Sequence, residues 1–263
     1  MTQHNDSVLS LKNVSYYRQG RPILKNINFE IRPGQHWALL GLNGSGKSTL
    51  IHILSGYDWP SAGQVTVLGE RFGQTNISRL KRRIGLVSSW LEYRLPENDS
   101  VLKIVLSGLF ASFGLYQAVG PKEKLAAQEL LARFDCQDLA DRPFATLSQG
   151  EKQKILILRG LMTKPELLIL DEPFNALDLF ARERLLEFLG EVSQEEGLSL
   201  VMISHRSEDI SQLFQHVLLL KEGQVFAQGS RQDMLQDELL TDFYGQAVDC
   251  LPYKDQRVLV VPR

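Results

Sequence analysis

The stretch from Gly41 to Ser48 restricts the fold of this chain most, because it completes the phosphate-binding pattern Gly-x-x-x-x-Gly-Lys-Ser. Apolar residues precede it at 37–40 and follow it at 50–54, which predicts a buried strand, a loop and a helix. Glycines leave backbone N–H groups free to face phosphate oxygens, and the N-terminus of the helix adds the positive end of its dipole. The pattern therefore predicts an α/β protein that binds a nucleoside triphosphate.

Each residue type in this loop has a physical role in the prediction. Lys47 neutralises the outer phosphates, and the hydroxyl of Ser48 completes the shell of a magnesium ion that bridges them. The cofactors expected are thus ATP and Mg²⁺. The residues predicted to bind the nucleotide in this segment are Gly41, Asn43, Gly44, Ser45, Gly46, Lys47, Ser48 and Thr49.

An acidic pair, Asp171 and Glu172, follows the apolar run at 167–170. A carboxylate at the C-terminal end of a parallel strand beside a phosphate loop can reach the magnesium shell, so Asp171 is predicted as a metal ligand. Glu172 points in a different direction and is predicted to act as the general base that polarises the attacking water.

Composition excludes several other classes. The 263 residues include 29 basic and 31 acidic ones, a net charge of −2, which gives no support for a nucleic-acid surface or a polybasic membrane anchor. Cys136 and Cys250 are too few for a disulfide framework or a metal cluster, which favours a reducing cytosol. The polar start of the chain and the lack of an apolar run of membrane-spanning length predict a chain with no signal peptide that does not span a membrane.

Periodicity predicts strands, then a helix-rich middle, then strands again. The middle extends from about Val101 to Met162, and a strand–helix–strand unit follows with its helix at 181–192. Gly223 and Gln224 are expected to turn a hairpin, and one helix is expected near Arg231 to Phe243. The strands are expected at 8–11, 23–31, 36–40, 64–68, 167–170, 198–203, 217–220 and 225–227.

The pentapeptide Leu147 to Glu151 is predicted to begin a helix that runs to Leu161. Ser148 is suited to the N-cap, and Glu151, three residues later, is suited to be its reciprocal partner in a capping box.

Together, these motifs resemble those of the ATP-binding cassette family. The pentapeptide at 147–151 is similar to the signature Leu-Ser-Gly-Gly-Gln, 175–178 to the D-loop, and His205 to the switch histidine. The resemblance implies a P-loop NTPase fold with a RecA-like core at about 1–89 and 163–246. It also implies an antiparallel β subdomain, a helical signature subdomain at about 90–162, and a single nucleotide-binding domain over 1–246.

The family resemblance also implies a head-to-tail homodimer that sandwiches two ATP molecules. Each ATP would lie between Lys47 of one subunit and Ser148 and Gly150 of the other, with Asp178 of the D-loop also assigned to the nucleotide. His205 would contact the γ-phosphate beside Glu172. Tyr17 is predicted to stack on the adenine, with Tyr16 as the alternative.

Two departures from the family pattern stand out. Ser89 occupies the position where the family usually has a glutamine, and it is assigned to magnesium or the attacking water through a shorter side chain. In the signature, Gln149 replaces a glycine and Glu151 replaces the glutamine, which we expect to be tolerated.

In transporter members, the helical insertion forms a groove that receives a membrane subunit. Its apolar residues, Leu106, Leu109, Phe110, Phe113 and Tyr116, suit either that groove or the subdomain's own core, and Trp90 and Tyr93 are assigned to partner contact. We therefore expect a transport ATPase on the cytoplasmic face of a membrane with a separate permease. The alternative is a soluble ATPase, since the pattern is also similar to stand-alone cassettes of the molybdate-uptake group.

The C-terminal tail at 247–263 contains a strand-like run at 258–261. It is suited to packing on the core, to extending a sheet edge or to contacting a partner, and its sequence does not choose among these roles.

Overall fold

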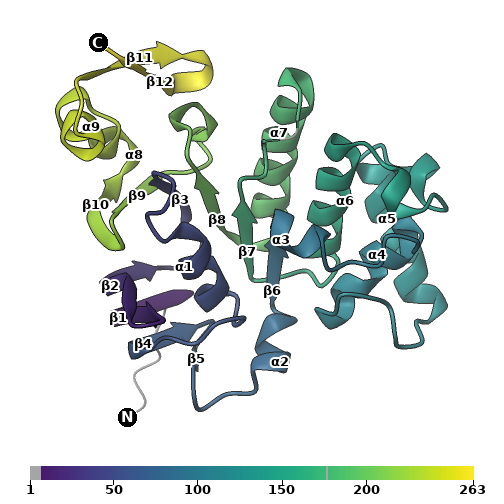
Figure 1. Cartoon of the computed structure of the whole chain (residues 1–263). Helices are drawn as coiled ribbons and strands as arrows, with labels where there is room; N and C mark the ends of the chain where they lie inside the picture. Colours follow the sequence, from purple (N-terminus) through teal and green to yellow (C-terminus); the bar gives the residue numbers. More distant parts are fainter. Residues whose placement is uncertain (1–6, 176) are drawn as a thin grey trace.

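The central sheet of the protein carries the phosphate loop, as seen in a computed structural model that describes residues 7–175 and 177–263 (Figure 1). In these residues the sheet has six strands in the order β10-β9-β3-β8-β7-β6, all parallel to their neighbours except β10, which is antiparallel to β9. The strands are β3 (His36–Gly41), β6 (Ile84–Val87), β7 (Leu167–Asp171), β8 (Ser199–Ser204), β9 (His216–Lys221) and β10 (Gln224–Ser230).

The strands of this sheet are apolar along their length because both faces are covered. In β3, Ala38 and Leu40 face one hydrophobic cluster, whereas Trp37 and Leu39 face a second cluster on the other side. Alternation along a strand sends successive side chains to opposite faces, so a continuous apolar run suits a sheet buried on both. The predicted strand–helix–strand unit is confirmed, since β7 and β8 pair in parallel.

A smaller antiparallel sheet covers one face together with helix α1 (Lys47–Leu54). Its strand order is β2-β1-β4-β5, and its side chains share the second hydrophobic cluster with α1. Its strands are β1 (Leu9–Arg18), β2 (Arg21–Ile31), β4 (Ala62–Val67) and β5 (Glu70–Arg71). The predicted fold class, a P-loop NTPase core with an antiparallel β subdomain, is therefore confirmed.

Helices cover the other face and form the insertion beyond β6 (Figure 1). No helix among the described residues is both long and apolar enough to cross a membrane. The helices are α2 (Ile77–Lys81), α3 (Ser89–Glu92), α4 (Val101–Ser107), α5 (Pro121–Arg133), α6 (Gln149–Leu161), α7 (Leu179–Glu196), α8 (Arg231–Met234) and α9 (Asp237–Tyr244). Short 3₁₀ turns are η1 (Gly108–Phe110), η2 (Gln137–Leu139), η3 (Phe144–Thr146), η4 (Ser207–Asp209) and η5 (Lys254–Gln256).

The single helix expected near Arg231 to Phe243 was wrong, because the chain breaks into α8 and α9 at Leu235, whose ψ of 61° is not helical. Leu235 and Leu240 are both buried. On one continuous helix, two residues five positions apart would point about 140° apart. The break allows both side chains to reach the core.

The hairpin between β9 and β10 turns one residue earlier than expected. Lys221 pairs with Gln224, so the turn residues are Glu222 and Gly223, with φ values of 50° and 77°. A Cβ atom at Gly223 would lie 2.2 Å from the carbonyl oxygen of Ile23. Its N–H donates to the Ser45 carbonyl at 3.0 Å, and its carbonyl accepts from Lys25 N–H at 2.8 Å. This glycine therefore joins the hairpin to the phosphate loop and to β2.

The C-terminal tail forms a third sheet of two antiparallel strands, β11 (Val248–Tyr253) and β12 (Arg257–Pro262). Val248, Val258 and Val260 pack on the first hydrophobic cluster. The tail therefore packs on the core, one of the roles that its sequence left open.

Candidate nucleotide site

The phosphate loop lies between β3 and α1, and its glycines meet specific steric demands. Gly46 has a φ of 100°, and a Cβ atom there would lie 2.7 Å from the Leu24 side chain. Gly41 has no room for a Cβ atom either, since Ser45 Oγ would be 2.6 Å away. Only glycine permits this close approach of neighbouring groups.

Lys47 is buried at the first position of α1, where its ammonium group donates to the carbonyl oxygens of Gly41 at 2.7 Å and Leu42 at 3.0 Å. Burial lowers the pKa of Lys47, and the charges of Glu172 and Asp171 act against that change. A positive charge is thus held at the mouth of the loop, opposite two carboxylates.

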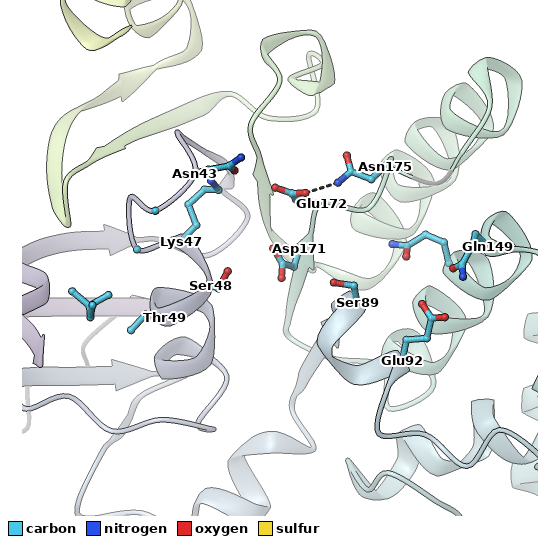
Figure 2. Close-up of a pocket in the computed structure, with 14 residues that line it drawn as sticks. Asn43, Lys47, Ser48, Thr49, Ser89, Glu92, Gln149, Asp171, Glu172 and Asn175 are labelled. Atoms are coloured by element: carbon cyan, nitrogen blue, oxygen red, sulfur yellow. Dashed lines mark hydrogen bonds between the residues drawn. The ribbon is translucent and has the colours of Figure 1, made fainter. Parts of the chain in front are cut away.

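A cavity of about 490 Å³ extends from the phosphate loop to the start of α6 (Figure 2). Figure 2 shows Lys47 and Ser48 on one side, Asp171 and Glu172 in the middle, and Gln149 on the far side. The predicted residues that line the cavity are Asn43, Gly44, Gly46, Lys47, Ser48, Thr49, Ser89, Asp171 and Glu172. The lining residues that sequence reasoning left out are Ile23, Glu92, Gln149, Gln153 and Asn175.

Asp171 ends β7, and its carboxylate accepts a hydrogen bond from Ser88 Oγ at 2.9 Å. Burial raises the pKa of Asp171, and the Ser88 bond counteracts the rise. The hydroxyl that contacts Asp171 is thus that of Ser88. Ser89, the next residue, begins α3 and lines the cavity.

These residues fit a magnesium ion. The Ser48 hydroxyl and the Asp171 carboxylate are hard oxygen donors that both line the cavity, and Mg²⁺ usually takes one or two carboxylates, waters and substrate phosphates. No cluster of three or more His, Cys, Asp or Glu residues suited to a metal occurs in the described ranges.

Glu172 follows β7 in a left-handed conformation with a φ of 49°, which is uncommon for a residue with a side chain. Its Oε1 lies 3.0 Å from Nδ1 of His205, and its Oε2 accepts a short hydrogen bond from the amide of Asn175 (Figure 2). The backbone N–H of Glu172 donates to the carbonyl of Ile203 at 2.9 Å. The carboxylate is therefore held at both oxygens beside the cavity.

The capping box at the start of α6 is confirmed. Ser148 Oγ accepts from the Glu151 N–H at 3.3 Å, and the Glu151 carboxylate accepts from the Ser148 N–H at 2.7 Å. That second bond lowers the pKa of Glu151. Ser148 and Gly150 do not line the cavity of their own chain, whereas Gln149 and Gln153, one turn apart, do.

Two other predicted residues lie away from this cavity. Asp178 is exposed and caps α7, since its Oδ1 accepts from the Ala181 N–H at 2.8 Å. Ala176 of the same loop lies outside the described residues. Tyr17 is 52% exposed near the end of β1 and does not line the cavity. Ile23, on the neighbouring strand β2, does line it. Tyr16 packs against the second hydrophobic cluster.

The residues missed by sequence reasoning carry weak local signals. Asn175 lies three residues beyond Glu172, within reach of its side chain across a turn. Glu92 lies three residues beyond Ser89 on the same helix, and its carboxylate accepts from Lys152 of α6 at 3.0 Å. Spacing along a helix or turn makes such neighbours candidates, but it does not select them.

Comparison with known proteins agrees with this geometry. A family model described as ABC transporter matches residues 24–175. The ABC transporter ATP-binding protein YmeB of Lactococcus lactis is 40% identical to the chain, over 97% of the chain and 99% of its own length. The ABC transporter ATP-binding protein YlmA of Bacillus subtilis is 42% identical, over 96% of the chain and 96% of its own length. ModF of Escherichia coli is 36% identical over 81% of the chain and 44% of its own length.

Solved structures show the same likeness. The dimeric cassette MJ0796, also seen in a post-hydrolysis state with ADP and Pi, has a TM-score of 0.76 at 26% identity, covering 85% of this chain and 98% of that one. An ABC transporter solved in an inward-facing conformation has a TM-score of 0.78 at 29% identity, covering 98% of both chains.

Proposed function

This chain belongs to the ABC transporter family as one of its ATP-binding ATPases, and from that membership we propose how its residues divide the work of ATP hydrolysis. The phosphate loop, residues 41–49, holds the phosphates. Lys47 supplies the main positive charge toward the outer phosphates. Ser48 and Asp171 hold Mg²⁺, which neutralises charge on the phosphates when bound.

The observation that carries the catalytic assignment is the fixed carboxylate of Glu172. It lies on the cavity wall opposite Lys47, with one oxygen on His205 and the other on Asn175. A general base must be oriented toward the water whose proton it accepts, and a base with both oxygens held is oriented. We assign Glu172 as the base, and His205 as the group that orients it and reaches toward the γ-phosphate.

The active form in this proposal is a homodimer. Ser148 and Gly150 stand at the N-terminus of α6 outside their own cavity, so they are free to close the site of a second copy. A helix N-terminus favours anions through its N–H groups and dipole. In a two-fold dimer both sites close by the same contact. The γ-phosphate would hold the two subunits together until hydrolysis removes it.

A separate membrane permease is the partner that we propose for transport, with the ATPase on the cytoplasmic face. Tyr93 and Tyr116, near the two ends of the segment that joins β6 to α5, are 88% and 81% exposed. Trp90, on the same segment, belongs to a ring cluster with Tyr57 and Phe113 at centroid distances of 4.9 Å and 6.0 Å. Exposed aromatic residues beside a packed ring cluster suit a protein contact.

A second function, driving a change in a soluble protein partner, is favoured by Ser89. Its short side chain stands where the sequence pattern calls for glutamine, and its neighbour Ser88 is the residue bonded to Asp171. If coupling between the nucleotide site and a permease depends on the longer glutamine side chain, that coupling would be altered in this protein.

The deciding experiment is affinity purification of the Glu172→Gln variant with ATP and Mg²⁺ from detergent-solubilised native cells. We expect a polytopic membrane protein to co-elute, and to be lost when Lys47→Ala is added. Recovery of soluble partners alone, with an ATP-dependent dimer, would favour the second function.

A further inference from the structure

The C-terminal hairpin of β11 and β12 contacts the segment that carries His205. The N–H of Val260 on β12 donates to Ser207 Oγ at 3.1 Å, two residues beyond His205. Ser207 is buried in the short turn η4, against which β12 packs. The hairpin therefore supports the outer side of the segment at 204–209, which we name the switch segment.

Arg257 ties the same hairpin to the start of α7. Its side chain is 1% exposed, and its Nη2 donates to both carboxylate oxygens of Glu183, at 2.8 Å and 3.0 Å. Its Nε donates to the Lys254 carbonyl at 3.0 Å, while Nη1 is buried without a hydrogen-bond partner among the described residues. Because a buried guanidinium loses its hydration, breaking the Glu183 contact would leave it poorly compensated.

The first turn of α7 is also bound directly to the switch segment. Arg182, next to Glu183, forms a short ion pair with Asp209. Asp209 accepts from Ser204 Oγ at 2.5 Å, and Ser204 Oγ accepts from the Arg206 N–H at 2.9 Å. These bonds flank His205 on both sides in the sequence.

These contacts form a closed ring. The hairpin binds α7 through Arg257 and the switch segment through Val260, and α7 binds the switch segment through Arg182. His205 belongs to the switch segment of this ring and its imidazole contacts Glu172, and α7 begins one residue after Asp178. We propose that the C-terminal hairpin is a brace for the ATPase site and that Arg257 is the positioning residue that fixes His205 and the start of α7.

The brace rests on the proposed function, because it takes Glu172 and His205 as the groups at the reacting phosphate. Its effect is on orientation and leaves the phosphate loop untouched. Displacing a catalytic group by about 1 Å can lower a rate by up to roughly 100-fold. Loss of the brace should therefore lower kcat, while KM for ATP, set mainly by the phosphate loop, stays near its original value.

The test compares Arg257→Met, Glu183→Gln and the double variant with the full-length wild type, well below their unfolding temperatures. We expect each single variant to lower kcat about tenfold with KM within twofold, and the double to be no worse than either single variant. Arg257→Lys, which keeps the charge but loses the planar group that donates to both Glu183 and Lys254, should recover part of the rate. Glu183→Gln also serves if Arg257→Met does not fold.

Arg263→Met is the matched control. Arg263 lies at the end of the same hairpin and pairs with Asp249 at 2.6 Å and Asp237 at 3.1 Å, away from α7. It should leave kcat unchanged. Equal losses of kcat in Arg263→Met and Arg257→Met would overturn Arg257 as the positioning residue, because any weakening of the hairpin would then suffice.

A second measurement does not depend on catalysis. Amide hydrogen exchange of the peptide covering 204–209 should be faster in Arg257→Met than in wild type and unchanged in Arg263→Met. Unchanged exchange, or additive losses of kcat in the double variant, would overturn the proposal. Faster exchange with unchanged kcat would keep the contact but overturn its positioning role. A wild type that binds but does not hydrolyse ATP would count against the catalytic assignment, while the exchange data would still judge the brace.

Discussion

Nδ1 of His205 lies 3.0 Å from Oε1 of Glu172, because the two residues directly follow β7 and β8, which are neighbours in the central sheet. The other oxygen of Glu172 is held by Asn175, so the carboxylate has little freedom to rotate. Of the two residues, Glu172 lines the cavity, together with Lys47 (Figure 2).

Removing the negative charge from this pair should stop hydrolysis and spare binding. Glu172→Gln keeps the shape of the side chain but cannot accept a proton, so we expect kcat to fall on the order of 10²- to 10⁴-fold with ATP affinity retained. Single-turnover hydrolysis and ATP titration measure the two effects. A rate within threefold of wild type, with contaminating ATPase excluded, would show that Glu172 is not the base.

Lys47→Ala should greatly weaken nucleotide binding. Hydrogen bonds from a charged group are worth about 1.5–3 kcal/mol, which corresponds to roughly 10- to 150-fold in affinity. Calorimetric titration with ATP checks this, and Lys103→Ala, on an exposed face of α4, serves as the control. An affinity within threefold of wild type would contradict the role of Lys47.

Ser88→Ala should weaken the binding of magnesium more than Ser89→Ala does. Ser88 holds Asp171 at 2.9 Å, whereas Ser89 begins the next helix at the cavity wall. Loss of a residue that orients a metal ligand typically lowers metal affinity by at least tenfold, so the Mg²⁺ concentration for half-maximal activity should rise roughly tenfold in Ser88→Ala. The opposite ranking would support the original prediction that Ser89 is the metal-side residue.

Glu151→Gln should tighten the ATP-dependent dimer. The Glu151 carboxylate places a negative charge at the helix end offered to the partner's phosphate, and glutamine keeps the capping box without that charge. A charge at a helix terminus is worth about 0.3–1 kcal/mol, which predicts roughly two- to fivefold tighter association. Sedimentation of Glu172→Gln with and without Glu151→Gln measures it, and Glu129→Gln on α5 is the control.

The ion pair of Glu166 with Arg83 should make stability depend on pH in acid. Hydrogen bonds from Arg83 at 2.6 Å and 2.9 Å lower the pKa of Glu166 below the ordinary value of a glutamate. When a carboxylate has a lower pKa in the folded protein than in the unfolded chain, it stabilises the fold fully at pH values above the unfolded-chain pKa. This contribution is lost as the pH falls through the pKa of the folded protein.

Glu166→Gln should therefore lower the free energy of unfolding by about 0.2–1 kcal/mol at pH 7 and by less near pH 4. Thermal unfolding of both proteins at pH 7, 5 and 4 measures the difference. A gap between wild type and variant that grows toward pH 4 would contradict the sign.

The sequence predicted the parts of the site whose residues lie close together in the chain. The phosphate loop, the strand before Asp171 and the capping box of Ser148 each depend on local spacing, and each was found. The break at Leu235 was missed because tertiary burial of both Leu235 and Leu240 outweighed a continuous helical pattern.

Residues brought together by the sheet could not be read from spacing. Ser88 meets Asp171 because β6 pairs with β7, and Arg257 meets Glu183 only after the tail has folded back onto the core. The adenine role of Tyr17 stays a prediction from the family resemblance; in the structure, Ile23 of the paired strand lines the cavity and Tyr17 does not.

The turn at Gly223 has a consequence for how the protein is made. Its N–H binds the Ser45 carbonyl inside the phosphate loop, and its carbonyl binds Lys25 on β2, so the loop near the start of the chain is completed by a turn near its end. Because synthesis proceeds from the N-terminus, a chain still on the ribosome lacks this support until residue 223 has emerged. We expect the nascent protein to gain firm ATP binding only after residue 223 has emerged, so a copy shorter than that would bind ATP too weakly to pair with a finished one.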